Sequence, residues 1–398
     1  MSAVAARLAP FGTTIFTEMT RLAVEHNAVN LAQGFPDFDG PEFLKHAAIE
    51  AINAGRNQYA RMTGDPVLNT AIAADWRKRA GASLDPDKQV TVTSGCTEAI
   101  AATMLGILNP GDKVVLFEPF YDSHRACVSI AGATALYVPL RPPTGVEPGE
   151  ICARPFAFDE SELRRAFAAR PRAIVVNTPH NPTGKVFTRE ELALIASLCV
   201  ENDTIAITDE VYEHLLFDPA LPHLHLATFP GMADRTVTLS SLGKTFSLTG
   251  WKIGWAIASP QLSAAVRAAH QFLTFATSTP MQHAAAVAMQ EGDAYIAELV
   301  ADYHVKRDFL AKVLASLRMR VYLPAGTYFI MADHSPLGLG ADVEFCRHLT
   351  TKVGVAAIPP SVFYDRPSLG ANLVRFAFCK KQGTLDEAAR RLGTLRGA

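Results

Sequence analysis

The sequence predicts an α/β fold in which a large domain, with a mainly parallel sheet between helices, is joined to a smaller α+β domain. Its 398 residues are long for one domain, so one large domain plus a smaller one is expected. From about residue 90 to about residue 260, short apolar runs alternate with helix-like segments. This alternation is typical of a parallel sheet covered by helices.

Six apolar runs predict the strands of the sheet. They are Val90–Thr93, Val114–Phe117, Ala173–Val176, Ile205–Thr208, Val237–Leu239 and Ile253–Ile257. Because the runs are apolar almost throughout, they fit strands that are buried on both faces. Helix-like segments such as Glu98–Leu108 and Arg189–Val200 lie between some of them. Ligands of open α/β sheets bind at the C-terminal ends of strands, where the polar residues described below fall.

The C-terminal part predicts the smaller domain. A helical region spans Gln261–Leu317, and strand-like Thr327–Met331 and helical Val343–Lys352 follow. Strand-like Leu373–Phe378 precedes a last helix that starts at Leu385. The expected division is an N-terminal arm with part of the small domain at 1–43, a large ligand-binding domain at 44–285, and a small C-terminal domain at 286–398.

Composition and charge narrow the function classes. Hydrophobic residues make up 49% of the chain and charged residues 19%, so it can bury a sizeable core. A formal net charge of −2 gives no electrostatic reason to expect nucleic acid or an anionic membrane as a partner. Arg7 and Pro10 interrupt any signal-like N-terminal run, and the stretch between Arg267 and Glu291 is too polar to span a membrane. Six cysteines without a CxxC pair predict reduced thiols and a cytoplasmic protein.

The strongest local signal for chemistry is the lysine in the turn Ser240–Phe246. An apolar strand ends there, and the turn presents Lys244 to the crevice of the sheet. A lysine that forms a Schiff base must lose its proton, which partial burial and a nearby cation such as Lys252 favour. Ser241 and Lys252 suit a phosphate on the same cofactor. The alternative is a lysine in a surface turn. The segment is not a P-loop, because Thr238 stands where that motif needs glycine.

A carboxylate follows the apolar strand that starts at Ile205. Pyridoxal 5′-phosphate (PLP) needs an anion against its pyridine nitrogen, and Asp209 is placed to be that anion. Tyr212, three residues further on, can reach the phenolic oxygen of the ring. The alternatives for Asp209 are a helix N-cap and a metal-binding acid, although no metal ion is expected in this chain.

Two turns after apolar strands offer further ligand contacts. The segment Asn177–Gly184 contains two prolines and a glycine that make a rigid turn, from which Asn181 can donate to the phenolic oxygen. The segment Thr93–Glu98 is a strand end, a glycine turn and a helix start, so the N–H groups of Cys96 and Thr97 can receive a phosphate. An ordinary capped helix fits the second segment equally well.

Two further side chains are candidates for ligand binding, although each of them could also have a purely structural role. Tyr121 can stack on a pyridine ring, although an aromatic residue there is more often part of the core. Arg375 is a lone cation in an apolar strand, and a bidentate carboxylate is its best partner. The alternative for Arg375 is a structural salt bridge.

Taken in order, these motifs resemble those of class I, fold-type I PLP-dependent aminotransferases. The matching segments are Asn30–Asp37, Asn57–Tyr59, Ser94–Glu98, Asn181–Gly184, Asp209–Tyr212, Ser241–Lys244 and Arg375. The resemblance covers nearly the whole chain and is greatest to the branch of kynurenine–oxoglutarate transaminases, methionine aminotransferases and N-succinyldiaminopimelate aminotransferases. Segments typical of that branch are Gln33–Phe38, Gly326–Phe329 and Val355–Pro359.

The resemblance implies PLP as the cofactor and a catalytic role for Lys244. Lys244 is expected to hold PLP as a Schiff base and to move the proton between Cα and the cofactor. Asp209 is expected to hold the pyridine nitrogen, and Asn181 and Tyr212 the phenolic oxygen. The residues expected at the phosphate are Gly95, Cys96, Thr97, Ser241 and Lys252.

The resemblance also implies substrate and dimer contacts. Arg375, Gly34 and Asn181 are expected to bind the substrate carboxylate, Phe16 to line the substrate pocket, and Tyr121 to stack on the cofactor. Tyr59 is expected to reach the phosphate of a partner subunit, which implies a homodimer with shared active sites.

Two residues depart from the pattern of this branch. Cys96 replaces a common alanine, which has no consequence if only its N–H is used. His124 replaces a common aromatic residue near the cofactor loop, so it bears on which side chain the site accepts.

The expected reaction is ping-pong transfer of an amino group from an L-amino acid to a 2-oxo acid. Apolar residues such as Phe16, Tyr121 and those near Phe275 favour large neutral or aromatic donors of the methionine, kynurenine or glutamine kind. A second buried cation would instead favour N-succinyl-LL-diaminopimelate. The sequence does not place the candidates for that cation, which are Arg21, Arg61, Arg125 and His124.

Two further hypotheses are β-elimination from cysteine S-conjugates and, more remotely, a non-catalytic ligand sensor with the same fold. The first is PLP chemistry that the kynurenine transaminase branch allows. No GxGxxG follows the strands, which argues against a nicotinamide dehydrogenase.

Overall fold

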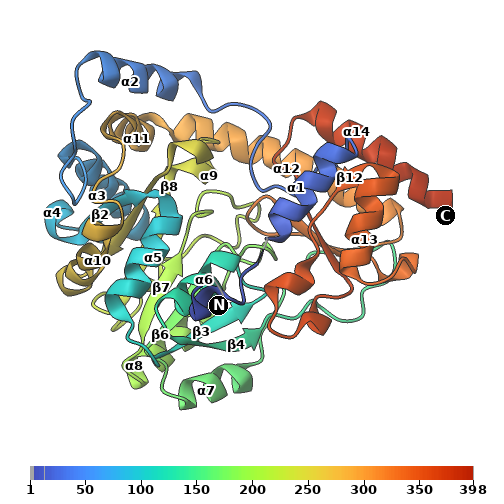
Figure 1. Ribbon diagram of the computed structural model, residues 1–398, viewed down its shortest axis with the longest axis horizontal. Coiled ribbons are helices and arrows are strands. Elements are labelled where there is room, and N and C mark those ends of the chain that lie inside the picture. Colours follow the sequence, from blue (N-terminus) through green and yellow to red (C-terminus); the bar gives the residue numbers. More distant parts are fainter. Residues whose placement is uncertain (1–3, 13, 398) are drawn as a thin grey trace.

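A seven-stranded sheet forms the centre of the larger part of the chain in the computed structural model, which describes residues 4–12 and 14–397 (Figure 1). Its order is β2-β9-β8-β7-β6-β3-β4. The bounds are β2 Val90–Ser94, β3 Lys113–Glu118, β4 Thr134–Pro139, β6 Ala173–Asn177, β7 Ile205–Asp209, β8 Thr236–Ser241 and β9 Ile253–Ala258. Only β9 runs antiparallel to its neighbours, which confirms the mainly parallel sheet.

Each of the six apolar runs lies within one of these strands, and successive residues pack on opposite faces. In β6, Ile174 and Val176 pack with α7 and α8, whereas Ala173 and Val175 pack with α5 and α10. Burial on both faces explains the unbroken apolar runs. The sequence prediction missed β4, an edge strand whose first four residues are exposed or half-buried.

Helices cover both faces of this sheet (Figure 1). Their bounds are α2 Glu42–Asn53, α3 Pro66–Ala80, α4 Pro86–Gln89, α5 Gly95–Ile107, α6 Asp122–Ile130, α7 Glu160–Ala168, α8 Arg189–Glu201, α9 Leu242–Thr245, α10 Pro260–Leu273 and α11 Thr279–Glu291. Caps start several of them. The side chain of Thr188 accepts from the Glu191 N–H while the Glu191 carboxylate accepts from the Thr188 N–H, which satisfies two N–H groups at the start of α8.

The smaller part of the chain contains a four-stranded sheet of order β13-β11-β10-β5 and a two-stranded pair β1-β12. The strands are β1 Val29–Asn30, β5 Ile151–Cys152, β10 Arg320–Tyr322, β11 Phe329–Asp333, β12 Val355–Ala356 and β13 Leu373–Ala377. The helices are α1 Ile15–Glu25, α12 Asp293–Ser316, α13 Asp342–His348, the π-helix η5 Leu349–Val353 and α14 Gln382–Leu392. Short 3₁₀ turns are η1 Ala6–Leu8, η2 Leu226–Thr228, η3 Thr249–Trp251, η4 Ser335–Leu337, η6 Pro360–Phe363, η7 Pro367–Leu369 and η8 Gly393–Gly397.

The structure refines the expected elements of this part. The helical region 261–317 is divided into α10, α11 and α12, with Phe275 at a positive φ of 64° in the first break. The strand expected from Thr327 starts at Phe329, because Thr327 has a φ of 68° and donates its N–H to Leu215 instead of a strand neighbour. No helix among the described residues is both long and apolar enough to span a membrane.

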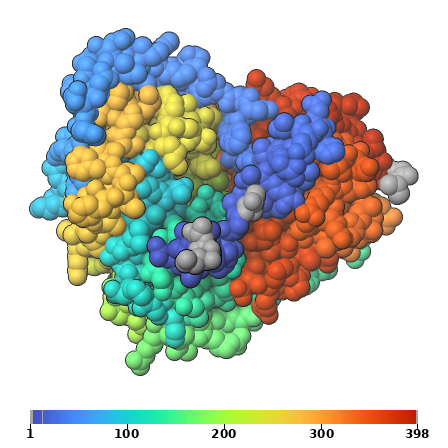
Figure 2. Space-filling view, viewed as in Figure 1, coloured from blue at the N-terminus to red at the C-terminus, as the bar shows by residue number. Residues whose placement is uncertain are grey.

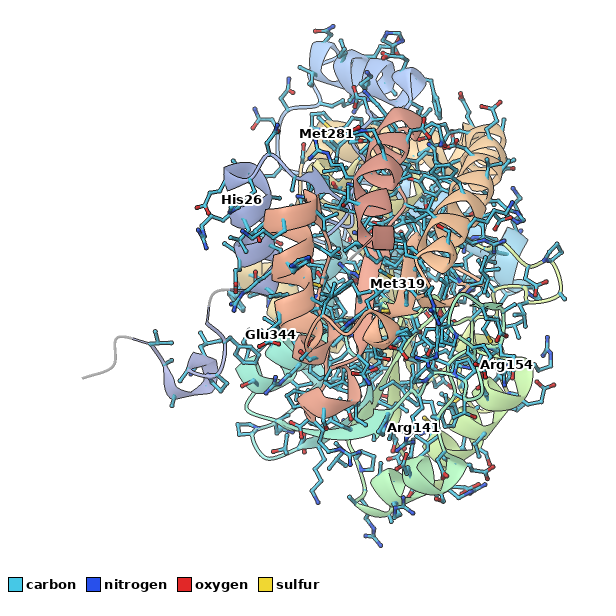
Figure 3. The ribbon with its side chains drawn as sticks, turned by 90° about the vertical axis from the view of Figure 1, so that its right-hand side faces the viewer. His26, Arg141, Arg154, Met281, Met319 and Glu344 are labelled. Carbon is cyan, nitrogen blue, oxygen red and sulfur yellow. The ribbon has the colours of Figure 1, made fainter. Side chains whose placement is uncertain are left out.

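The N-terminal segment reaches across the two parts of the chain. Figure 2 shows it, in dark blue, lying over the junction between the teal part and the orange-red part. In the side view of Figure 3, η1 stands out from the body, where the Ser129 hydroxyl donates to the Arg7 carbonyl oxygen at 2.6 Å. Helix α1 packs Phe16 and Leu22 against the core of the smaller part. Residues 1–3 and 13 of the predicted arm lie outside the described residues, and the domain bounds remain a prediction.

Candidate functional site

A cavity of about 380 Å³ opens where the C-terminal ends of the central strands face the smaller part of the chain. Every residue predicted to bind the cofactor or to line the substrate site, except Tyr59, lines it. They are Phe16, Gly34, Gly95, Cys96, Thr97, Tyr121, Asn181, Asp209, Tyr212, Ser241, Lys244, Lys252 and Arg375. The strand ends supply most of these residues, as expected for an open α/β sheet.

One end of the cavity is formed by the start of α5, against which β9 packs closely. Gly254 pairs with Thr93 of β2 and with Ser241 of β8. A Cβ at position 254 would lie 2.4 Å from the Gly95 carbonyl carbon and 2.6 Å from the Cys96 nitrogen, so only glycine allows this approach. Helix starts leave N–H groups without intrahelical partners. These groups, the Ser241 hydroxyl and the Lys252 ammonium meet at one point and can hold a dianion.

Lys244 lies in the short helix α9, which directly follows β8. Its Nζ is 3.4 Å from the Gly34 carbonyl oxygen and 5.8 Å from the ring centroids of both Tyr212 and Tyr328. Burial lowers the pKa of the Lys244 ammonium, although the Cys379 thiol and the Asp209 carboxylate oppose the shift. The lowered pKa increases the fraction of neutral amine, which is the nucleophilic and basic form.

Asp209 is buried at the end of β7 and is held by its neighbours. His124 Nε2 lies 2.8 Å from its Oδ2, and the Cys96 thiol lies 3.8 Å from its Oδ1. His124 is itself buried and contacts the Tyr121 ring edge to face at 5.4 Å. The carboxylate is therefore fixed in the wall of the cavity.

A chain of hydrogen bonds links Asp209 to Arg375 across the site. Asn177 Nδ2 donates to the Asp209 carbonyl at 2.8 Å, and Asn177 Oδ1 accepts from the Asn181 N–H at 2.7 Å. Asn181 Oδ1 in turn accepts from Arg375 Nη1 at 3.0 Å, and Arg375 Nη2 donates to the Ala32 carbonyl oxygen at 3.1 Å. The strand ends and the smaller part are thereby held in one frame.

Arg375 is a buried cation whose described hydrogen bonds go to neutral oxygens. It is 2% exposed, and its Nε has no partner among the described residues. Three aromatic rings surround it, and the ring of Phe329 lies 4.1 Å from Cζ. Burial lowers the pKa of Arg375 to about 10, so the group remains cationic near neutral pH. A buried guanidinium of this kind favours an anionic ligand.

Aromatic residues and one glycine complete the walls. Tyr328 donates its hydroxyl to the Gly34 carbonyl oxygen at 2.6 Å, and a Cβ on Gly34 would lie 2.6 Å from the Phe329 ring. Tyr121 lines the opposite side, where burial raises its pKa to about 12. Burial also raises the pKa of Tyr212 above its ordinary value. Both phenols are therefore proton donors at neutral pH.

Several predicted residues lie away from the cavity. Tyr59 is on the surface with its side chain 86% exposed, and it contacts the Phe275 ring at 5.9 Å. None of the three candidate arginines lines the cavity. Arg21 pairs with Glu25, and Arg61 pairs with Asp87. Arg125 lies over the rings of Phe11 and Phe120. His124 contacts Asp209 and does not line the cavity.

Sequence reasoning missed four contacts of the site. They involve Asn177, Asp122, Tyr328 and His124, which all fall in segments that it singled out. The position of Asn177 at the last residue of a buried strand was a usable signal. The contacts of His124 and Tyr328 depend on tertiary packing, because they join residues 85 and 294 positions apart.

Comparisons with known proteins agree on one family. Residues 26–392 match the profile described as aminotransferase class I and II. A probable N-succinyldiaminopimelate aminotransferase of Mycobacterium tuberculosis is 49% identical over 98% of both chains. The methionine aminotransferase of Escherichia coli is 39% identical over 98% of this chain and 97% of the other. The solved N-succinyldiaminopimelate aminotransferase of Mycobacterium tuberculosis superimposes with a TM-score of 0.94 at 49% identity, covering 99% and 100% of the two chains.

The chain belongs to the class I and II aminotransferases. It has the fold-type I architecture and is a transaminase whose cofactor is PLP. The branch expected from the sequence motifs is also confirmed.

The residues of the cavity fit PLP. The close approach of Gly254 to the start of α5 leaves a cradle for a phosphate next to Ser241 and Lys252. A fixed carboxylate, Asp209, suits a protonated pyridine nitrogen, and a lysine of lowered pKa suits an aldehyde. The donor set thus matches the phosphate, the ring and the reactive carbon of the cofactor.

Substituting Gly254→Ala tests the packing that forms this cradle. The added Cβ must push β9 away from α5, so we expect a loss of about 1–3 kcal/mol in the free energy of unfolding. Denaturant titration measures the loss. Gly250→Ala is the matched control, because a Cβ there meets no atom within 4 Å. Equal stability of the two variants would contradict the proposed constraint.

Proposed function

We propose that the chain transfers the amino group of a large neutral or aromatic L-amino acid to a 2-oxo acid by a ping-pong mechanism. The observation that carries this proposal is the buried Arg375, which offers one anion site in a cavity that several aromatic rings, among them Phe16 and Phe329, also line. Such a site suits one α-carboxylate next to an apolar side chain.

PLP, when bound, supplies a ring that withdraws electrons from the substrate Cα. The start of α5, Ser241 and Lys252 would hold its phosphate, and Asp209 would hold its pyridine nitrogen; all of them line the cavity. Asn181 and Tyr212 would donate to its phenolic oxygen, and Tyr121 would pack on the ring. Asn181 lies in the hydrogen-bond chain to Asp209, so both contacts are set by the same frame.

Lys244 is the base that moves the proton. Arg375 and Gly34 bind the α-carboxylate, which orients Cα toward the lysine amine. With PLP bound, the neutral Lys244 amine would be placed to accept the Cα proton of the substrate and to give it back. The Nζ of Lys244 is held at the cavity by the Gly34 carbonyl oxygen and by the rings of Tyr212 and Tyr328.

Replacing Lys244 with alanine tests the role of the base. We expect amino-group transfer to fall by at least ~10²–10⁴-fold, the usual contribution of a general base. Stopped-flow absorbance with saturating PLP measures this rate, and far-UV circular dichroism checks the fold. Near-normal turnover in this variant would rule out the assignment.

His124 offers a test of the Asp209 contact that does not depend on turnover. Loss of its N–H in His124→Met removes one hydrogen bond to a buried carboxylate, worth about 1.5–3 kcal/mol. We expect PLP to bind the apoprotein ~10–100-fold more weakly, as measured by quenching of tryptophan fluorescence. His124→Gln, which keeps an N–H donor, should lose less. Identical affinities for the two variants would show that the hydrogen bond has no effect on PLP.

The cations of the cavity limit the donor. In the part of the chain that the structure describes, the lining cations are Lys244, Lys252 and Arg375, and the first two serve PLP in this proposal. Asp122 also lines the cavity, and a second substrate carboxylate close to it would be repelled unless Asp122 is protonated. These charges favour a neutral side chain.

A second candidate donor is N-succinyl-LL-diaminopimelate. The 49% identity to the probable N-succinyldiaminopimelate aminotransferase of Mycobacterium tuberculosis supports it. Among the described residues of this chain, no cation lines the cavity besides Lys244, Lys252 and Arg375. The second carboxylate of this donor would therefore need a cation from a partner subunit or from outside the cavity.

Titrating the holoenzyme with single amino acids, without an acceptor, separates the two donors. Methionine or kynurenine should convert the cofactor to its aminated form, seen as loss of the visible absorbance band, at lower concentration than N-succinyl-LL-diaminopimelate. Conversion by the latter alone would overturn the neutral donor and leave the transaminase assignment intact.

A homodimer with shared active sites and a cytoplasmic location are further parts of the proposal. Tyr59, Phe272 and Phe275 form an exposed aromatic patch, with Phe272 85% exposed. A patch of this kind favours burial against a second copy. The six free cysteines, five of them buried, are compatible with a reducing compartment.

A further inference from the structure

A second cluster of ionisable side chains lies directly behind the wall of the cavity. Glu210 and Glu213 alternate with the site residues Asp209 and Tyr212 along the chain. His223 and His225 come from the loop that follows. One ligand atom from each of the four lies within 4.8 Å of all the others, and Glu210, Glu213 and His225 are buried.

The contacts within this cluster leave one carboxylate oxygen without a partner. Glu210 Oε2 receives both His223 Nε2 at 2.7 Å and His225 Nδ1 at 2.6 Å. Glu210 is 0% exposed, and its Oε1 has no hydrogen-bond partner among the described residues. An unpartnered oxygen on a fully buried carboxylate is costly. A cation at this carboxylate would remove the cost.

The charges of the cluster and its surroundings do not balance. The carboxylates of the cluster and its surroundings are Asp75, Glu210 and Glu213. Among the described residues, one guanidinium pairs with them, that of Arg79, which contacts Asp75 and Glu213. Ser240 also donates to Glu213 Oε1 at 2.6 Å. With neutral imidazoles, two negative charges remain uncompensated in a buried region. A divalent cation supplies the missing charge of +2, and the alternative source is protonation of both histidines.

We propose that Glu210, Glu213, His223 and His225 form a binding site for a divalent metal ion of the zinc type. Two imidazoles and two carboxylates are a common ligand set for four-coordinate Zn²⁺. Ligand atoms at about 2.1 Å from a tetrahedral ion lie ~3.4 Å from one another, so the widest pair in the cluster must close by up to ~1.4 Å. The two histidine nitrogens that now lie 2.7 and 2.6 Å from Glu210 Oε2 must move apart from that oxygen. This site is distinct from that of PLP, because none of its four residues lines the cavity. Glu210 and Glu213 are only neighbours in the chain of Asp209 and Tyr212, which do.

The ion would have a structural role. It would join the segment 209–213, which carries Asp209 and Tyr212, to the loop that carries His223 and His225. Trp76 covers the outer side, with its ring 4.7 Å from that of His225. His214, the nearest other imidazole, lies next to Glu213 in the chain and contributes no ligand atom to the cluster.

Metal binding by the holoenzyme tests this inference. The protein is treated with a chelator, desalted and mixed with one equivalent of Zn²⁺ or Co²⁺. After gel filtration, elemental analysis should find about one zinc per subunit. The Co²⁺ form should show d–d absorbance bands between about 500 and 650 nm, as four-coordinate nitrogen and oxygen ligands produce. These bands lie at longer wavelength than the absorbance of PLP.

Variants of the histidines identify the ligands. His225→Asn and His223→Asn should each weaken Co²⁺ binding by at least ~10–100-fold, the loss that even a supporting residue causes. The matched control is His270→Asn, because His270 is also buried against a glutamate, Glu98, at 2.7 Å but has no second histidine beside it in that contact. Its Co²⁺ spectrum should be unchanged.

Several outcomes would overturn the site. Less than about 0.1 zinc per subunit, or no Co²⁺ bands in the wild-type protein, would show that protons balance the cluster. Unchanged bands in His225→Asn would place the metal elsewhere. If one histidine variant does not fold, as thermal unfolding would reveal, the Co²⁺ spectrum of the other histidine variant locates the metal.

Discussion

Burial of the Arg375 guanidinium next to neutral oxygens is the constraint on which the site depends. The cation is held by Asn181 and by the Ala32 carbonyl, and Asn181 is held through Asn177 by the strand that ends in Asp209. One hydrogen-bond chain therefore connects the Arg375 guanidinium to the backbone carbonyl of Asp209. Since Asn177, Asn181 and Arg375 are buried in the wall of the cavity, moving either end breaks at least one of these hydrogen bonds. The two parts of the protein act as one frame around the reacting carbon.

The opposite end of the site depends on close packing. Gly254 in the one antiparallel strand allows β9 to touch the start of α5, and the same strand pairs with Ser241 of β8. A single reversed strand thus brings a helix start, a hydroxyl and Lys252 to one point. Phosphate binding there would fix the ring relative to Lys244, whose lowered pKa is useful only if the aldehyde carbon lies within its reach.

Most of the fold and of the site were predictable from sequence, because strands buried on both faces are read directly from apolar runs. The polar residue that follows such a run can then point to the site, as Asp209 does, whereas Asn181 was found from the turn that follows its strand. Strand β4 was not predicted, although residues 135–140 are apolar throughout, so this run was a usable signal that sequence reasoning missed. The donor of the Asp209 hydrogen bond was not predicted either. His124 is 85 residues from Asp209, and only the packing of α6 on the sheet brings them together. Placement of Arg21, Arg61 and Arg125 outside the cavity also required the structure.

The segment 209–213 serves two environments with alternate side chains. Asp209 and Tyr212 face the cavity, whereas Glu210 and Glu213 lie in the charged cluster behind it. Three carboxylates within five residues would repel one another strongly if they shared one environment of low dielectric constant. They are separated onto two sides, with Arg79 and the two imidazoles beside Glu210 and Glu213 and with His124 beside Asp209. Charge compensation behind the wall therefore reduces the repulsion that Asp209 meets at the cavity. His225 does not line the cavity, so an effect of its substitution on Asp209 would pass through the segment 209–213.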